Sequence, residues 1–321
     1  MRNRVFGRTG LKISEIGHGT WTMGSMWGPR DDAAALASLH RSLELGVNFI
    51  DTAYVYGDGH SENLIGQTLR RWNGKIFVAT KVPPKNYQWP ARHHVPITDT
   101  FPADHIVKYT ETSLKNLKMD CVDLQQLHVW SDSWMKDLGW LEGVEKLKKQ
   151  GKIRFFGVSI NDHEPDSALK IVDSGLVDSV QVIYNIFDQT PEEKLFPLCQ
   201  KKNVAVIARV PFDEGALTGT LTPETQFLKG DWRVKYFTPE RLKETCGRVE
   251  KLKELAQREG MSLPVLALKF CLSHPAVSTV IPGMRKAAHV EDNCAAAGRM
   301  LSPEEVAELR NHAWPRNFYD L

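Results

Sequence analysis

Three segments of the sequence place an ionisable side chain where a short apolar run ends. Asp51 follows "VNFI", Lys81 follows "IFVAT" and His128 follows "DLQQL". A phenol also lies just beyond the acid, because tyrosines stand at both Tyr54 and Tyr56. If the three runs are neighbouring strands of a parallel barrel, their ends meet at one rim, and the four kinds of side chain can converge there.

Such a set of side chains is suited to giving a proton to an oxygen while the adjoining carbon accepts a hydride. A free phenol has a pKa of about 10, too high for efficient proton donation near neutral pH. A neighbouring ammonium stabilises the phenolate and lowers that pKa, and a carboxylate paired with the ammonium fixes its position. A neutral imidazole can orient a carbonyl oxygen by hydrogen bonding.

Each side chain taken alone also has an ordinary explanation. An aspartate at a strand end often caps a turn, a lysine there is usually solvated, and a histidine can bond within the core. These explanations weaken because three consecutive strand ends carry groups in a coherent chemical order.

The elements that must position these residues follow an alternating rhythm. Short β-rich runs recur along the chain, and most are nearly continuously apolar, as expected for parallel strands covered on both faces. The predicted strands cover residues 13–17, 47–51, 76–80, 122–127, 153–158, 179–183, 204–208 and 277–281.

Helical patterns separate the predicted strands. One helix is expected after Asp31 and Asp32 and ends at Gly46. Others are expected over residues 102–119, from Trp140 to Gly151, and over residues 239–259. Eight strands alternating with helices predict a (β/α)₈ TIM barrel, an α/β fold in which residues 1–321 form a single domain. A doubly wound sheet is the alternative, because it alternates in the same way.

Three segments go beyond a minimal barrel. Residues 4–15 contain two short β-like pieces around "GRTG", and we expect an N-terminal β-hairpin that closes the barrel bottom. The proline-rich segment 81–102 and the segment from Val210 to Thr238 are long loops, which are usually functional in compact domains. Both follow strand ends, so we expect them on the C-terminal face where barrel active sites lie.

Composition and charge exclude several classes of protein. The net charge of +2 gives no electrostatic reason to expect binding to nucleic acid or to an anionic membrane. No apolar run is long enough to span a bilayer, and the first residues lack the apolar stretch of a signal peptide. The five cysteines are scattered and odd in number, which favours reduced thiols and a cytoplasmic protein. We expect Cys121 and Cys271 to pack among apolar residues.

Several common motifs fail on inspection. The segment "GHGTWTMG" has its third glycine too late for the dinucleotide-binding G-x-G-x-x-G pattern, and G-x-x-x-x-G-K-[ST] is absent. The segment "GVSIN" has Asn161 where a nucleophile elbow needs glycine. His93 and His94 are adjacent, which is poor geometry for one metal ion, and no H-E-x-x-H occurs, so we expect no metal.

Segments across nearly the whole chain resemble the aldo-keto reductases, in particular bacterial-type members with a short C-terminal loop. The matching segments, in family order, are "GVNFIDTAYVYGDGHSENLIG", "ATKV", "LQQLHVW", "KIRFFGVS" and "VIPGMRKAAHVEDN". The resemblance implies a (β/α)₈ barrel that uses NADP(H) or NAD(H) without a Rossmann domain. It also implies a catalytic tetrad of Asp51, Tyr56, Lys81 and His128. It selects Tyr56 as the proton donor because the family's donor directly precedes the glycine, and it leaves Tyr54 a packing or turn residue.

The cofactor contacts match the family pattern at some positions and depart from it at others. Ser159 and Gln181 match residues that hold the nicotinamide carboxamide, but Ile160 stands where an asparagine commonly follows the serine, and Asn161 comes one residue later. Arg209 stands where an aromatic residue often stacks on the nicotinamide. The loop "VPFDEGALTG" resembles the one whose backbone binds the pyrophosphate, with Gly215 allowing close approach. The cofactor-binding residues implied are Thr20, Trp21, Asp51, Ser159, Asn161, Gln181, Arg209, Pro211, Phe212, Gly215, Leu217, Gly283, Arg285, Asp292 and Asn293.

The eighth strand bears on the choice of cofactor. Gly283 stands where many relatives have lysine, but Arg285 and Lys286 follow at the start of a helix. Two cations there suit the 2′-phosphate of NADPH, so the resemblance favours NADPH over NADH. Asp292 and Asn293 match the family pair that contacts adenine.

Aromatic side chains dominate the segments expected at the rim. Trp21, Trp27, Trp89 and Trp130 are the predicted substrate-pocket residues, and an apolar pocket favours aromatic or hydrophobic aldehydes and ketones over strongly charged sugars. The function we expect is NADPH-dependent, reversible reduction of small-molecule carbonyls.

Two other functions stay open at this point. One is a cofactor-binding regulatory or scaffold subunit with weak reductase activity, since this family includes channel-associated members. The other is a Schiff-base aldolase that uses Lys81 as its nucleophile, although the nearby Asp51 and Tyr56 argue against it.

Overall fold

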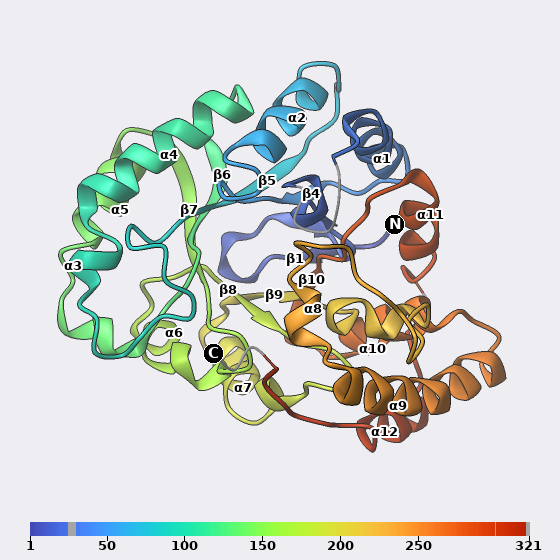
Figure 1. The fold of residues 1–321 in the computed structure, drawn as a ribbon. Helices are drawn as coiled ribbons and strands as arrows, with labels where there is room; N and C mark the ends of the chain where they lie inside the picture. Colours follow the sequence, from blue (N-terminus) through green and yellow to red (C-terminus); the bar gives the residue numbers. More distant parts are fainter. Residues whose placement is uncertain (25–29, 299, 319–321) are drawn as a thin grey trace.

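Eight parallel strands form the centre of the computed structural model, which describes residues 1–24, 30–298 and 300–318. Each strand pairs with the next one along the chain, and helices surround the strands when the molecule is viewed along the barrel (Figure 1). The strands are β3 (His18–Gly19), β4 (Phe49–Asp51), β5 (Phe77–Val82), β6 (Val122–Leu127), β7 (Ile153–Ser159), β8 (Ser179–Ile183), β9 (Ala205–Arg209) and β10 (Val277–Val280).

The sheet closes on itself between its first and last strands. Ile16 bridges Val280 and Gly19 bridges Gly283, both in parallel orientation. The backbone N–H of Gly17 donates to the Val280 carbonyl at 2.8 Å. The predicted TIM barrel is therefore confirmed, and the doubly wound alternative, which has an open sheet, is wrong.

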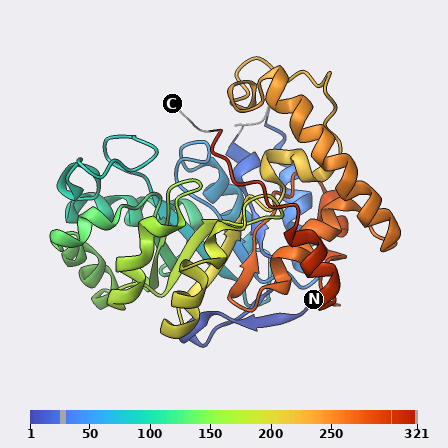
Figure 2. The same cartoon turned by 90° about the horizontal axis from the view of Figure 1, so that it is seen from below.

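The predicted N-terminal hairpin is also present. Strands β1 (Asn3–Val5) and β2 (Lys12–Ser14) pair antiparallel, and Figure 2 shows them lying across one end of the barrel. Phe6 and Ile13 of this segment are buried in the barrel interior. There they form one apolar cluster with Phe49 and Phe77. The hairpin closes the barrel bottom by burying these side chains.

The first barrel strand lies later in the chain than predicted. Residues 13 and 14 belong to β2 of the hairpin, and the strand that pairs with β4 is His18–Gly19. The apolar run at 13–17 is buried for two different reasons, since Ile13 fills the barrel bottom while Ile16 lies in the layer between sheet and helices. Apolar periodicity could not separate these two environments.

Twelve helices occur within the described residues. They are α1 (Asp32–Glu44), α2 (His60–Leu69), α3 (Ile97–Thr100), α4 (Ala103–Leu117), α5 (Leu141–Lys149), α6 (Leu169–Ser174), α7 (Leu195–Lys202), α8 (Arg233–Tyr236), α9 (Pro239–Arg258), α10 (Leu263–Ser273), α11 (Ala287–Cys294) and α12 (Pro303–Arg310).

Local capping explains where several helices begin. The Asp31 carboxylate accepts from the backbone N–H of Ala34 at 2.9 Å at the start of α1. Thr238 caps α9 in the same way, and Pro239 occupies its first turn, where a missing N–H costs nothing. The four helices expected from capping and periodicity are confirmed to within two residues at each end.

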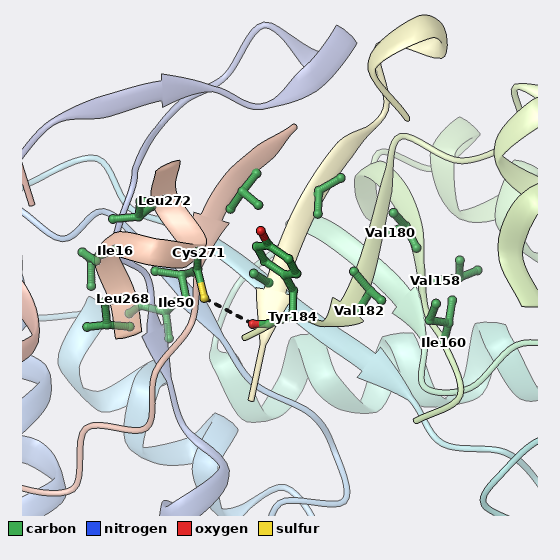
Figure 3. Packing of buried hydrophobic residues seen from close by; sticks show 14 of the residues in the cluster. Ile16, Ile50, Val158, Ile160, Val180, Val182, Tyr184, Leu268, Cys271 and Leu272 are labelled. Carbon is green, nitrogen blue, oxygen red and sulfur yellow. Dashed lines mark hydrogen bonds between the residues drawn. The ribbon is translucent and has the colours of Figure 1, made fainter. Parts of the chain in front are cut away.

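The main apolar core lies between the barrel strands and the helix layer. Figure 3 shows Leu268, Cys271 and Leu272 of α10 packed beside Ile16 and Ile50, and Cys271 Sγ is 3.2 Å from the Tyr184 carbonyl oxygen. All five cysteines are free thiols. Cys271 is fully buried in this apolar core, which raises the pKa of its thiol, whereas Cys121 is half-buried.

Candidate active site

A buried ion pair lies where strands β4 and β5 end side by side. Lys81 Nζ is 2.5 Å from Asp51 Oδ1, and it also donates to the Thr52 carbonyl at 2.8 Å. The two side chains are 0% and 2% exposed. Burial opposes the charged ammonium, but Asp51 and then Tyr56 raise the pKa of Lys81 above its ordinary value. One positive charge is thus held at the barrel mouth.

The Asp51 carboxylate is held from two further strands. Gln181 Nε2 of β8 donates to Asp51 Oδ2 at 2.8 Å, and Gln126 Nε2 of β6 lies 3.3 Å from the same oxygen. Thr20 Oγ1 donates to the Asp51 carbonyl at 3.0 Å. Sequence reasoning missed Gln126, although a glutamine within a wholly buried strand was the available signal.

Tyr56 is brought to this ion pair by the turn between β4 and α2. Gly57 and Gly59 have φ of 73° and 87°, a left-handed backbone that favours glycine. The turn leaves the phenol 7% exposed, with its oxygen 3.3 Å from Lys81 Nζ. Burial raises the pKa of Tyr56, while Lys81 acts in the opposite direction. The hydroxyl therefore keeps its proton near neutral pH.

His128 lies directly after β6 and faces Tyr56. Its ring centroid is 5.8 Å from that of Tyr56, in an edge-to-face arrangement. Burial, and then the positive charges of Lys81 and Arg209, lower the pKa of His128 well below its ordinary value. Its Nδ1 is buried without a hydrogen-bond partner among the described residues. The ring is a neutral imidazole beside the phenol.

These four groups together can protonate an oxygen placed between Tyr56 and His128. The phenol carries the proton, and the ammonium next to it stabilises the phenolate that remains. The neutral imidazole can bond to the same oxygen without adding a charge. The arrangement suits carbonyl reduction or, in reverse, alcohol oxidation.

The residues expected at the nicotinamide lie on neighbouring strands. Ser159 ends β7 and is paired in register with Gln181 of β8, whose amide is directed at Asp51. Arg209 ends β9 and donates to the Ile160 carbonyl at 2.9 Å and to Asp162 at 2.6 Å.

Asn161 is bonded away from the four groups. Its amide hydrogen-bonds to the backbone of Ala91 and to the Glu164 carboxylate.

The loop after β9 has an unusual backbone. Val210, Asp213, Glu214 and Gly215 have φ of 52°, 46°, 55° and 100°. The segment contains the short 3₁₀ helix η6 (Asp213–Thr218), and the expected residues Pro211, Phe212 and Leu217 lie in or beside it. Asp213 is almost fully buried and is paired with Arg316 from the C-terminal segment.

The residues expected at the adenosine end lie after β10 and on α11. Gly283 is exposed, and an added Cβ there would meet only Thr22, at 3.8 Å. Arg285 is half-buried and Asp292 is exposed. Asn293 is buried, and its Nδ2 has no hydrogen-bond partner among the described residues.

Two of the predicted pocket tryptophans border the tetrad. The ring centroids of Trp21 and Tyr56 are 5.0 Å apart, and those of Trp89 and His128 are 5.8 Å apart. Trp27 lies outside the described residues.

Trp130 is not brought to the same place. It is fully buried against Trp134 and Trp140, and its indole N–H donates to Asp132 at 3.0 Å. The short 3₁₀ helix η3 (Asp132–Lys136) supplies Asp132 and Trp134, which hold this ring in the core.

The described ranges contain neither a metal-binding cluster nor a helix able to span a membrane. No group of three or more His, Cys, Asp or Glu side chains there is arranged to hold a metal ion. In the same ranges no helix combines the length and apolar character needed to cross a membrane.

Comparison with known proteins gives matches over nearly the full chain. The model of the aldo/keto reductase family matches residues 15–313. The chain is 31% identical to aldo-keto reductase YhdN of Bacillus subtilis, over 94% of this chain and 90% of that protein. It is 26% identical to an NADH-specific methylglyoxal reductase of Escherichia coli, over 98% of each.

Solved structures give the same result. A glycerol dehydrogenase of Gluconobacter oxydans superposes with a TM-score of 0.79 at 28% identity, over 97% of this chain and 94% of that one. An aldo-keto reductase of Klebsiella pneumoniae in complex with NADPH superposes with a TM-score of 0.72 at 25% identity, over 98% and 96%.

Proposed function

We propose a specific role for this chain from the premise that it belongs to the aldo/keto reductase family and is an NAD(P)-dependent oxidoreductase. The proposed reaction is the NADPH-dependent, reversible reduction of hydrophobic aldehydes or ketones to alcohols. Tyr56 is the proposed proton donor, and Asp51, Lys81 and His128 complete the catalytic tetrad.

One observation carries this proposal. A buried phenol lies 3.3 Å from an ammonium that is itself fixed 2.5 Å from a carboxylate, next to a neutral imidazole. Tyr56 gives its proton to the carbonyl oxygen, and Lys81 stabilises the phenolate that forms. Asp51 holds Lys81 in place, and His128 orients the carbonyl. When bound, a nicotinamide cofactor supplies the hydride that the carbonyl carbon accepts.

The residues present fit a dinucleotide cofactor. Four residues of the loop after β9, Val210, Asp213, Glu214 and Gly215, have a left-handed backbone, and backbone concavities built from such residues suit an anion. Gly283 leaves open space at the other end of the proposed site, and Asn293 has a buried amide nitrogen that no described residue satisfies. Ser159 and Gln181 remain the proposed carboxamide contacts, and Thr20, Trp21, Arg209, Pro211, Phe212, Leu217 and Asp292 the other proposed contacts.

Cationic side chains favour NADPH over NADH. Arg285 and Lys286 precede α11, where two positive charges suit a 2′-phosphate. The relative described as NADH-specific shows that cofactor choice varies among similar chains. The ratio of kcat/KM with NADPH to that with NADH measures the preference directly, and a ratio below one would contradict this part of the proposal.

The indole rings of Trp21 and Trp89 favour apolar carbonyl substrates. Trp21 and Trp89 lie against Tyr56 and His128, so a carbonyl bound there is flanked by indole rings. A panel of aromatic, aliphatic and sugar aldehydes, followed by nicotinamide absorbance, tests this expectation. A clear preference for a phosphorylated sugar would be inconsistent with it.

Replacement of Tyr56 by phenylalanine tests the proposed proton donor. Tyr56→Phe should lower kcat by at least about a hundredfold, the scale of general acid catalysis, while the NADPH Kd from cofactor fluorescence changes little. Tyr54→Phe is the matched control, because Tyr54 packs on Tyr109 at 4.8 Å instead of facing Lys81, and it should keep its activity. Equal loss of turnover and of cofactor binding in Tyr56→Phe would show that its role is misassigned.

A further inference from the structure

The side-chain amide of Asn161 is engaged by Ala91, in the loop that follows β5, and by Glu164. Its Oδ1 accepts from the Ala91 N–H at 2.9 Å, and its Nδ2 donates to the Ala91 carbonyl at 3.2 Å. The second donor of Nδ2 goes to Glu164 Oε2 at 2.7 Å. Asn161 is 4% exposed. Both amide donors are therefore used, and neither partner is one of the four tetrad residues.

The Asn161 contact lies near the centre of that loop, and Tyr87 of the same loop also bonds to Tyr109 at 3.2 Å. At its first end, the Lys85 N–H donates to the Thr100 carbonyl at 2.8 Å. At its other end, the Trp134 indole donates to the Val95 carbonyl at 2.7 Å. Between these two fixed ends, Ala91 is held by its paired hydrogen bonds to Asn161.

A cavity borders the loop beside this anchor. It has a volume of about 630 Å³, and its lining includes Pro90, Ala91, Asn161 and Glu164. Ala91 is partly buried and packs against the main apolar core as well as bordering this cavity. The position of Ala91 is therefore set by this packing together with its two hydrogen bonds to Asn161.

The position of this loop matters for the substrate pocket. Trp89, two residues before Ala91, lies edge-on to His128 with ring centroids 5.8 Å apart. It is 38% exposed, so contacts with neighbours cover only part of the indole. A shift at Ala91 would move Trp89 relative to His128.

We propose that Asn161, steadied by Glu164, is a positioning residue that holds Trp89 edge-on to His128 and thereby sets which carbonyl substrates fit. On this inference, which rests on the proposed carbonyl reduction, Asn161 acts on the substrate side and is not a ligand of the nicotinamide. Asn161 stands one residue later than the asparagine of the family pattern. Its side chain bonds to Ala91 in the loop after β5 and, on this inference, not to the nicotinamide.

Replacement of Asn161 separates the two roles. Asn161→Ala should raise KM for an aromatic aldehyde about tenfold, the effect of losing one or two positioning hydrogen bonds, with a change of less than about twofold for a small aliphatic aldehyde. The NADPH Kd should stay within about twofold of wild type, because no bond to the cofactor is lost. A weaker NADPH Kd with unchanged KM for the aldehyde would overturn the proposal.

Variants of Glu164 and Trp89 test further whether Asn161 acts through the position of Trp89. Glu164→Gln keeps an acceptor for Asn161 and should preserve the wild-type KM for the aromatic aldehyde, whereas Glu164→Ala should raise it. In a Trp89→Ala background, Asn161→Ala should have almost no further effect on that KM, because both changes act through the same indole. Additive effects of the two substitutions would contradict the proposed coupling.

The rate of proteolysis in the loop tests whether Asn161 anchors it, and this measurement does not depend on carbonyl reduction. Tryptic cleavage after Arg92, measured relative to cleavage after the exposed Lys229, should be at least about fivefold faster in Asn161→Ala than in wild type, since local opening controls cleavage. Equal cleavage rates would show that Asn161 does not hold the loop. If wild type reduces no carbonyl, the proposed function fails, while the cleavage ratio still decides whether Asn161 anchors the loop.

Discussion

The protonation states of Tyr56 and His128 predict the pH dependence of carbonyl reduction. Burial raises the pKa of Tyr56, and burial together with Lys81 and Arg209 lowers that of His128. Between about pH 6 and pH 8 the phenol therefore stays protonated and the imidazole stays neutral. We expect kcat/KM for reduction to be level over this range and to fall only at alkaline pH, as Tyr56 ionises.

Steady-state kinetics at saturating cofactor would check this profile. An acidic limb between about pH 6 and pH 7 would indicate a histidine that titrates near its ordinary pKa, contrary to the buried position of His128. On the proposed mechanism, alcohol oxidation should show the opposite alkaline trend and rise with pH, because Tyr56 must then be deprotonated to accept the proton.

The order of residue types along the chain predicted which side chains meet at the site. It did not predict the hydrogen bonds that hold these side chains in place. Asp51, Lys81 and His128 could be picked out because each ends an apolar run, and the structure brings them together with Tyr56. Gln126 was overlooked, because its contact with Asp51 depends on barrel geometry across two strands.

At the scale of elements, the N-terminal hairpin is tied to the barrel by a largely buried ion pair. Arg4 Nε lies 3.1 Å from Glu15 Oε2, and the two side chains are 18% and 0% exposed. The same guanidinium donates to the carbonyls of Leu272 and Val277 at 2.8 and 3.0 Å. It thus joins β1 to α10 and β10.

Removing only one partner of the Arg4–Glu15 ion pair should lower the stability of the fold. Arg4→Met leaves the buried Glu15 carboxylate without its cation and should lower the free energy of unfolding by about 3 kcal/mol. The double variant Arg4→Met/Glu15→Gln removes both charges and should lose less. Urea unfolding followed by circular dichroism measures both, and a double variant less stable than the single one would argue against this account.

Helix boundaries were more predictable than strand boundaries for a local reason. Asp31 and Thr238 mark helix starts through bonds to backbone within three residues, and these are visible in sequence. The strand His18–Gly19 is defined by pairing with β4, about 30 residues away, and has no comparable local mark.

At the scale of the whole molecule, alternating strands and helices predicted parallel strands buried on both faces, but they did not by themselves separate the barrel from a doubly wound sheet. The surroundings of the tetrad were harder to predict because they depend on where loops turn. Trp89 and Trp130 both lie in segments after strands, yet only Trp89 reaches His128, while Trp130 turns into the core. Sequence patterns do not specify that direction.

The closure of the barrel should make the whole fold sensitive to acid. His18 of β3 is fully buried, its Nδ1 is 2.6 Å from Ser42 Oγ of α1, and burial lowers its pKa to about 3. In the unfolded chain a histidine takes up a proton below about pH 6.5, whereas folded His18 stays neutral. The unfolded state therefore binds more protons as the pH falls, and the stability present above about pH 6.5 is progressively lost below it.

Replacement of His18 by glutamine, which can still bond to Ser42, would isolate this effect. Between pH 7 and pH 5, the free energy of unfolding of His18→Gln should fall by about 2 kcal/mol less than that of wild type, because one titrating group has been removed from the unfolded state. Urea unfolding of both proteins at the two pH values measures the difference. Parallel losses in the two proteins would mean that His18 takes up its proton in the folded barrel, which its burial at the closing strand opposes.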